Sequence, residues 1–338
     1  MPEDVFAEQA IGGSTMLHIT DGESVAGTLR DSAIPGVVST YGDLMYEGPA
    51  PADLDDQAWF EIRAHFVAEA GYANLEDARQ FLKACENALA AFSEHDEVVI
   101  WLDNKLSNQL ILIKILDWFS RRNLGMVTLS LICIGQYPGL EHFRGLGALT
   151  ANQLASLADT RLGVDDAQYR TAQSAWNAFT SPDPTEIQHL LATDTSALPF
   201  LAAALRRHLE QFPSVDNGLS RTEQQALSVI REHGAVSGRQ LFAAVQHQEQ
   251  QVFMGDRSFY RMMADLSRAR CPLIHVSDRC QVGLGDVSIT EAGREVIEGR
   301  ADHIDLNGID RWIGGVHLKG DKAAWRWDRT SEWIVSHQ

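Results

Sequence analysis

The sequence lacks long hydrophobic runs and has little cysteine. No stretch approaches the ~18 consecutive apolar residues that a membrane-spanning helix needs. The N-terminus, Met1-Pro2-Glu3-Asp4, is acidic and lacks the basic flank and apolar core of a secretory signal peptide. The cysteines are far apart, and no two of them have the spacing of a zinc site or a redox pair: Cys85, Cys133, Cys271 and Cys280. These absences predict a cytoplasmic protein with reduced thiols and no contact with a membrane.

Basic residues are also scarce. The 338-residue chain carries 28 Lys and Arg against 46 Asp and Glu, which gives a net charge of −18. The deficit is uneven, because residues 1–215 hold 13 basic and 29 acidic residues whereas residues 216–338 hold 15 and 17. An acidic N-terminal part repels nucleic acid and membrane phosphates at long range, so the charge disfavours nucleic acid as a partner. The near-neutral C-terminal part leaves room for a local basic face.

The N-terminal part alternates short apolar runs with helix-like periodicity. Four runs rich in Val, Ile and Leu predict strands that are buried on both faces, at residues 17–20, 36–40, 97–102 and 127–134. Apolar spacing predicts one helix at 25–30, two within 56–92 and one at 106–122. This alternation implies right-handed crossovers and a mainly parallel sheet. After a loose leader, we therefore predict a Rossmann-like α/β domain over residues 1–149, with strand order 2-1-3-4.

Two further units follow in the chain. Residues 150–214 have helical periodicity only, with capping residues at the helix starts, and are predicted to form a helical block packed on the sheet domain. A linker at 213–218 comes next. The capping box from Ser220 to Glu223 then begins the first of three predicted helices, which precede two short strands. This order is typical of a winged helix, so we predict a winged-helix-like α+β domain over 219–338 with a Gly- and Trp-rich tail.

Two predicted strands end in polar clusters directly before a helix. Ligands of open α/β sheets bind outside the carboxyl ends of the strands, where the strand order reverses. With the order 2-1-3-4, strands one and three are neighbours at that point, so their tips are predicted to line one ligand site. The candidate residues at these tips are Asp21, Gly22, Glu23, Ser24, Asp103, Asn104, Lys105, Asn108 and Gln109.

The chemistry of these tips suits a polar or phosphorylated ligand. Backbone amides at a helix N-terminus favour an anion, and Gly22 permits a close approach, although Asp21 and Glu23 repel phosphate unless a metal or ligand hydroxyls intervene. Asn104 and Asn108 share a helix face, and Lys105 supplies a positive charge. Simple helix capping, by Asp21 or Ser24 in the first cluster, is the alternative interpretation of both clusters.

The loop after strand two, at residues 41–49, has two tyrosines and ends in Gly48-Pro49. Its length and composition are more typical of a binding lid than of a connector. We therefore add Tyr46 and Glu47 to the candidate ligand-binding residues.

The third helix of the C-terminal domain carries Arg257, Arg261 and Arg268 on roughly one face. Arginines on a recognition helix contact phosphate or guanine. The same helix also has acidic residues and apolar residues for packing, so a protein–protein contact is the other interpretation.

The chain resembles a bacterial family catalogued as domain-of-unknown-function family 1835. The resemblance is carried by residues 17–26, 46–49, 101–118, 133–147 and 307–318. It implies the N-terminal α/β domain and the winged-helix-like C-terminal region of that group, and no established activity.

The chain departs from the family pattern at the predicted site. Relatives have Asp where this chain has Glu23, and an acidic-His-Asp cluster with a later Asp-Gln where it reads Asp103, Asn104, Lys105, Asn108 and Gln109. Loss of the histidine removes the natural general base near neutral pH. If relatives are enzymes, this departure implies an altered or inactive chain.

Three functions are consistent with these patterns. The first is a cytosolic protein that binds a small polar or phosphorylated ligand at the tips and uses the winged helix for regulatory or partner contacts. The second is a metal-assisted hydrolase or phosphoryl-transfer enzyme in which Asp21, Glu23 and Asp103 hold a divalent cation. The third is a DNA-binding regulator. The sequence assigns no catalytic residue and no cofactor, and it leaves a homo-oligomer open.

Overall fold

The computed structural model describes residues 15–277, 283 and 285–337. The leader at 1–14 and Cys280 lie outside the described residues. Within the described ranges, no helix is both long and apolar enough to cross a membrane. The N-terminal part contains β1 (Met16–Thr20), α1 (Glu23–Arg30), β2 (Val37–Thr40), α2 (Asp56–Glu69), α3 (Leu75–Ala90), β3 (Glu97–Asp103), α4 (Leu106–Ser120) and β4 (Thr128–Ile134).

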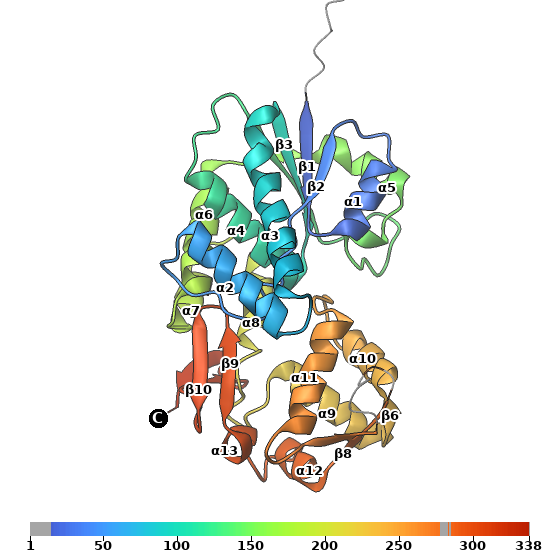
Figure 1. Cartoon of the computed structure of the whole chain (residues 1–338), viewed down its shortest axis with the longest axis vertical. Helices are drawn as coiled ribbons and strands as arrows, with labels where there is room; N and C mark the ends of the chain where they lie inside the picture. Colours follow the sequence, from blue (N-terminus) through green and yellow to red (C-terminus); the bar gives the residue numbers. More distant parts are fainter. Residues whose placement is uncertain (1–14, 278–282, 284, 338) are drawn as a thin grey trace, which may run out of the picture.

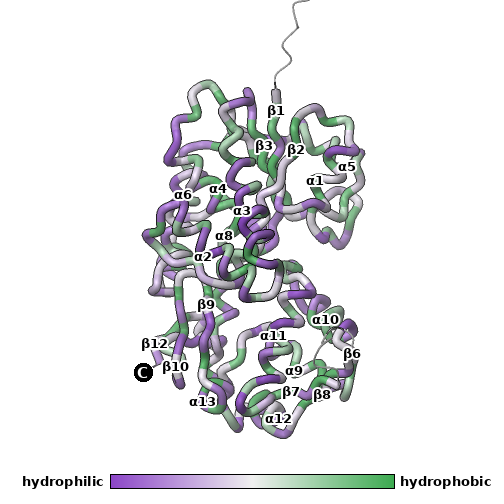
Figure 2. The backbone as a smooth tube through the Cα atoms, in the orientation of Figure 1, coloured by the Kyte–Doolittle hydropathy of each residue, from purple (hydrophilic) through white to green (hydrophobic). Residues whose placement is uncertain are grey.

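A five-stranded sheet with the order β2-β1-β3-β4-β5 forms the centre of this part. The first four strands are parallel, and Ile19 of β1 lies between Ser39 of β2 and Ile100 of β3. The predicted order of these four strands is confirmed. The fifth strand, β5 (Leu162–Gly163), was not predicted and pairs antiparallel with β4. Figure 2 shows hydrophobic residues along β1 and β3, as expected for strands covered on both faces.

The helices cover the two faces of the sheet in separate layers (Figure 1). On one face, Val25 and Leu29 of α1 pack with Trp101 of β3 and with α5 (Ala151–Leu157). On the other face, α4 packs against Ile19 and Ile100 and against α6 (Asp166–Thr180). The connection after β1 therefore leaves on one face, and the connection after β3 leaves on the other. In open α/β sheets, ligands bind at the strand tips where successive connections leave on opposite faces in this way.

The helical block has the capping residues that the sequence predicts. Capping boxes begin both α5 and α6, at Thr150 and Asp165. Before α7 (Thr185–Leu191), the Asp183 carboxylate accepts hydrogen bonds from the Thr185 backbone N–H and hydroxyl. The block ends with α8 (Leu201–Leu209).

The C-terminal part contains three helices with a core of their own, around Leu227, Leu241 and Phe259. These are α9 (Arg221–His233), α10 (Gly238–His247) and α11 (Asp256–Arg268), and capping boxes begin the first two. An antiparallel sheet with the order β6-β8-β7 lies beside them. Its strands are β6 (Val236–Ser237), β7 (Ile274–Val276) and β8 (Asp286–Ile289), and α12 (Glu291–Ile297) follows.

Most of the tail does not join that core, although Leu306 packs against it. Its elements are α13 (His303–Asn307), β9 (Ile309–Ile313), β10 (Val316–Gly320), β11 (Trp325–Asp328) and β12 (Trp333–Ser336). Ile313, Leu318 and Trp327 belong to the same apolar cluster as α4 and α6. Residues 219–338 thus contribute to two apolar clusters, because the tail packs with the first core. Figure 1 shows β9 and β10 beside α2 and α7, away from α12.

Hydrogen bonds to the tail hold the predicted linker at 213–218 in place as a turn. The backbone N–H of Trp327 donates to the Pro213 carbonyl at 2.8 Å, and that of Val215 donates to the Trp327 carbonyl at 3.0 Å. Arg326, which is 2% exposed, donates to the Ser214 carbonyl at 3.1 Å and to Asp302 at 2.6 Å.

Candidate ligand site at the strand tips

The polar clusters after β1 and β3 come together at one edge of the sheet. The two strands are parallel neighbours, and Thr20, the last residue of β1, lies opposite Trp101, two residues before the end of β3. Burial raises the pKa of Asp21 above its ordinary value, and the nearby Asp103 carboxylate raises it further, while Lys105, Thr20 and Asn108 lower it. Residues some eighty positions apart in the chain therefore share one electrostatic environment.

Asp103 connects several segments at this edge through its carboxylate. Its side chain is 1% exposed, and its Oδ2 accepts a hydrogen bond from the Leu146 N–H at 3.0 Å and pairs with the Lys105 ammonium at 3.1 Å. Its Oδ1 accepts from the Lys105 backbone N–H at 3.2 Å. The charge of Lys105 is thus already compensated by the protein.

The segment 145–147 lies across both tips. Gly145 has a φ of +96°, and a Cβ there would stand 2.1 Å from the Lys105 Nζ and 2.4 Å from the Asp103 Oδ2. A Cβ on Gly147 would stand 3.0 Å from the Ser24 Oγ. Only glycine permits this backbone and this approach at position 145, so the segment closes over the ion pair and reaches the start of α1.

Two asparagines at this edge are buried with few partners. Asn108 is 1% exposed, and neither of its amide atoms meets the strict hydrogen-bond geometry within the described chain, although its amide lies close enough to the Asp21 carboxylate to lower the pKa of Asp21. The Oδ1 of Asn104 is also buried and has no hydrogen-bond partner within the described chain. A buried polar group without a partner costs about 1–3 kcal/mol. Such groups need an explanation, and an absent bound molecule is one.

Both helices that begin here lack a side-chain cap. Gly22, the N-cap of α1, has no side chain, and the side chain of Lys105, the N-cap of α4, does not cap its helix. Capping by Asp21 or Ser24, the alternative interpretation of the first cluster, is therefore not what the structure shows for α1. The first backbone N–H groups of two helices remain available for a ligand at the same edge.

Two of the predicted residues have other roles. Glu23 is largely exposed and pairs with Arg30 on the surface of α1. The Nε2 of Gln109 donates to the Asp103 carbonyl at 2.7 Å, which fixes the end of β3. In the described part of the chain, no three His, Cys, Asp or Glu side chains gather as a metal site requires. The three carboxylates predicted to hold a metal are thus spread between the interior and the surface.

The loop at 41–49 is not a lid over the tips. Arg63 of α2 is fully buried and donates through Nε and Nη2 to the Asp43 carboxylate at 2.7–3.1 Å. Its guanidinium also donates to the carbonyls of Leu44, Glu47 and Pro49 at 3.0–3.1 Å. The expectation of a lid is wrong because one arginine binds four positions of the loop and holds it against α2.

Tyr46 and Glu47 lie at a contact between the two cores, away from the tips. The Glu47 Oε1 accepts from the Tyr72 hydroxyl at 2.5 Å and from the Ser258 hydroxyl at 2.7 Å, and its Oε2 pairs with Arg261. The Tyr46 hydroxyl is 2.9 Å from the Ser258 Oγ. These residues fasten the loop to α11.

The arginines of α11 also contact the rest of the chain. Arg257 donates to the carbonyls of Gly71 and Tyr72 at 2.8 and 3.1 Å, and Arg261 pairs with Glu47. The part of α11 that holds both side chains therefore faces the α/β part.

Sequence reasoning missed Arg63. A signal was present, because Trp59, Arg63 and Val67 follow one another at four-residue steps and lie on the buried side of α2. A charged residue in an apolar stripe indicates a buried ion pair.

Comparisons with known proteins add little to this geometry. No protein-family model matches the chain, and no curated protein matches it. Among solved structures, the DNA-binding, cleavage and re-ligation domain of Plasmodium falciparum topoisomerase II aligns with 10% identity and a TM-score of 0.48. The alignment covers 83% of this chain and 48% of that one, so the chain spans about half its length. A likeness at this TM-score carries no argument about fold or function.

Proposed function

We propose that the protein binds a small polar or phosphorylated ligand at the tips of β1 and β3. The observation that carries this proposal is Asn108, a buried amide whose oxygen has no partner within the described chain and whose nitrogen has only the nearby Asp21 carboxylate. Neighbouring uncapped helix starts and the Asn104 oxygen support it. We assign this site to a Rossmann-like domain of the family 1835 type, in a cytoplasmic protein.

The groups at the tips favour particular ligand chemistry. The Asn108 amide requires a donor and an acceptor from the ligand, as a hydroxyl or an amide group provides. Because Lys105 is paired with Asp103, a phosphate would depend on the backbone N–H groups of α1 and α4. A nucleoside or nucleotide offers both kinds of group.

We further propose that the three helices α9 to α11 and the sheet β6-β8-β7 form a winged-helix-like module for regulatory or partner contacts. Its support is the connection between the cores, where Glu47 of the α/β part receives hydrogen bonds or ion pairs from Ser258 and Arg261 of α11. The contact gives the module a defined place beside the ligand-binding part.

A thermal-shift screen with nucleosides, nucleotides and sugar phosphates tests the binding proposal. We expect at least one of these ligands to raise the Tm of the native chain, and Asn108→Leu to abolish that rise. Asn108→Leu is also expected to leave the unliganded protein as stable as before, or more stable, because it removes an unpaired buried amide.

The matched control is Gln188→Leu in α7. Gln188 is 4% exposed and its Nε2 is also unpaired, but it lies outside the tips. This variant should keep the full ligand response. Loss of more than about 2 kcal/mol of stability in Asn108→Leu would mean that the amide serves the fold itself, and the binding proposal would then lose its main support.

A further inference from the structure

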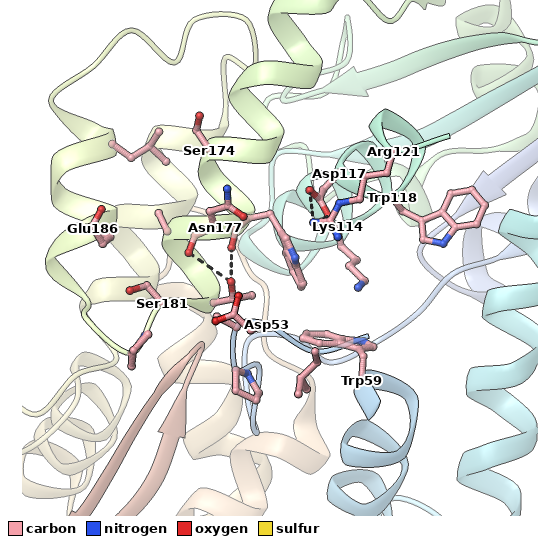
Figure 3. A pocket seen from close by; sticks show the side chains of 18 of the residues that line it. Asp53, Trp59, Lys114, Asp117, Trp118, Arg121, Ser174, Asn177, Ser181 and Glu186 are labelled. Atoms are coloured by element: carbon pink, nitrogen blue, oxygen red, sulfur yellow. Dashed lines mark hydrogen bonds and ion pairs between the residues drawn. The ribbon is translucent and has the colours of Figure 1, made fainter. Parts of the chain in front are cut away.

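A cavity away from the strand tips lies between α2, α4, α6 and α7. Its volume is about 1230 Å³, and none of its lining residues belongs to the strand tips. Trp59, Trp118 and Trp176 give it flat apolar walls, and Asp53, at a φ of 60°, lies in the loop that borders it. Figure 3 shows Lys114 extending from α4 toward Trp59 inside this space.

Lys114 occupies an unusual position for a lysine. Its Nζ is 4.3 Å from the ring centroid of Trp59 and 4.7 Å from that of Trp176. Contacts of this kind are worth about 0.5–2 kcal/mol each, less than the hydration that a buried ammonium loses. Burial accordingly lowers the pKa of Lys114 below its ordinary value, although Asp56 and Asp117 oppose this shift.

The carboxylates near Lys114 are committed to other cations. Asp117 pairs with Arg121 at 2.7 Å, and Asp56 pairs with Arg122 at 3.1 Å. Among the described residues, no carboxylate oxygen comes within ion-pair distance of the Lys114 Nζ. The indole faces are thus the only close partners of this charge within the described chain, and the cavity opens beside it.

We propose that this cavity binds a small monocarboxylate with a flat apolar body, whose carboxylate pairs with the ammonium of Lys114. The anion supplies the counter-charge that the protein withholds. The body packs on the indole rings of Trp59 and Trp176. A single negative charge fits better than a phosphate dianion, since Asp56 and Asp117 lie close enough to repel further negative charge. A cationic ligand is repelled by Lys114 itself.

Three probes of graded chemistry test this assignment on the full chain: benzoate, benzamide and inorganic phosphate. Benzamide has the shape of benzoate without its charge, and phosphate has charge without a flat body. Tryptophan fluorescence and calorimetric titration report binding. We expect benzoate to bind the native chain at least tenfold more tightly than either of the other two.

Lys114→Met removes the charge and keeps an unbranched stem, and it should weaken benzoate binding at least tenfold. Lys83→Met is the matched control, because Lys83 is an exposed lysine of α3 paired with Glu86, and it should bind benzoate like the native chain. Circular dichroism and Tm verify that both variants fold.

Four results would overturn the proposal: no benzoate binding, benzamide as tight as benzoate, phosphate as tight as benzoate, or benzoate binding unchanged in Lys114→Met. If Lys114→Met does not fold, the comparison of the three probes on the native chain decides alone.

Discussion

Arg63 and Asn108 are both buried polar side chains of the α/β part, and they differ in how they are satisfied. Arg63 has carboxylate or carbonyl partners for all three of its guanidinium nitrogens, and the loop at 41–49 wraps around it. Asn108, which follows β3 whereas Arg63 precedes it, has no partner for its amide oxygen within the described chain and only the Asp21 carboxylate near its nitrogen. Burial of each side chain costs free energy, but only the cost for Arg63 is offset by partners within the described chain.

This difference in hydrogen bonding distinguishes a residue that stabilises the fold from a residue that binds a ligand. A fully paired buried charge organises its neighbours, and removal of one partner leaves the other uncompensated. An unpaired buried amide stabilises nothing in the unliganded protein, so its presence favours a role in recognition. The same contrast distinguishes Glu47, which has several partners, from Lys114, which has only indole rings.

The largest effect is expected from Arg63→Ala. This change leaves the Asp43 carboxylate buried without its partner and should cost about 3–5 kcal/mol in the free energy of unfolding. Urea denaturation measures the loss. The control is Arg79→Ala, which breaks a half-exposed pair with Glu61 and should cost less than about 1 kcal/mol. Equal costs for the two variants would refute the claim that the Arg63–Asp43 pair stabilises the fold because it is buried.

A smaller effect is expected from Glu47→Gln. The change weakens charge-assisted hydrogen bonds to Tyr72, Ser258 and Arg261, and about 1.5–3 kcal/mol should be lost. A double-mutant cycle with Arg261→Gln measures how much of this loss belongs to the contact between the cores. Glu86→Gln, in an exposed pair with Lys83, serves as control. If the coupling between positions 47 and 261 is zero within error, the contact does not hold α11 in place.

The smallest effect, and one of opposite sign, is expected from Asp21→Asn. Because the folded-state pKa of Asp21 is raised, the native protein holds its proton where the unfolded chain has released it. Native stability therefore falls as the pH rises from the ordinary Asp pKa of about 4 through the raised value. Asp21→Asn should be more stable than the native chain at pH 7.

This advantage of Asp21→Asn should shrink toward zero at pH 3.5, below the ordinary Asp pKa. Urea denaturation of both proteins at the two pH values measures it. Glu23→Gln, at an exposed position two residues away, should shift stability by less than about 0.5 kcal/mol at either pH. A native chain that is more stable than Asp21→Asn at pH 7 would show that the ionised carboxylate is favoured, against the raised pKa.

The sheet and its tips were predictable because their signals are local and repeated. Buried parallel strands give continuous apolar runs such as Val98 to Leu102, and the rule for crossovers limits their order. The same rule placed Asp21 beside Asp103, two positions that no motif connects. The capping boxes at Thr150 and Ser220 were readable because each is contained within four residues.

The rest depended on contacts between distant segments, which periodicity does not encode. The loop at 41–49 has the composition of a lid, and its fixed position comes from Arg63, a residue of another element. The ion pair of Glu47 is with Arg261 of α11, so the sequence around Glu47 does not reveal it. Lys114 resembles any solvated helical lysine in the sequence, because Trp59 and Trp176 are both more than fifty residues away from it.

The return of the tail to the first core has a consequence for how the chain acquires its structure. The Gly314-Gly315 turn fits under the end of α6, where the Gly315 N–H donates to the Phe179 carbonyl at 2.9 Å and Ala50 donates to Gly314 at 3.0 Å. Residues near 50, 180 and 314 must therefore all have left the ribosome before this core is complete. The three-helix unit between them, with its separate core, has no such requirement and is positioned to fold during synthesis while the N-terminal part still waits for its last strands.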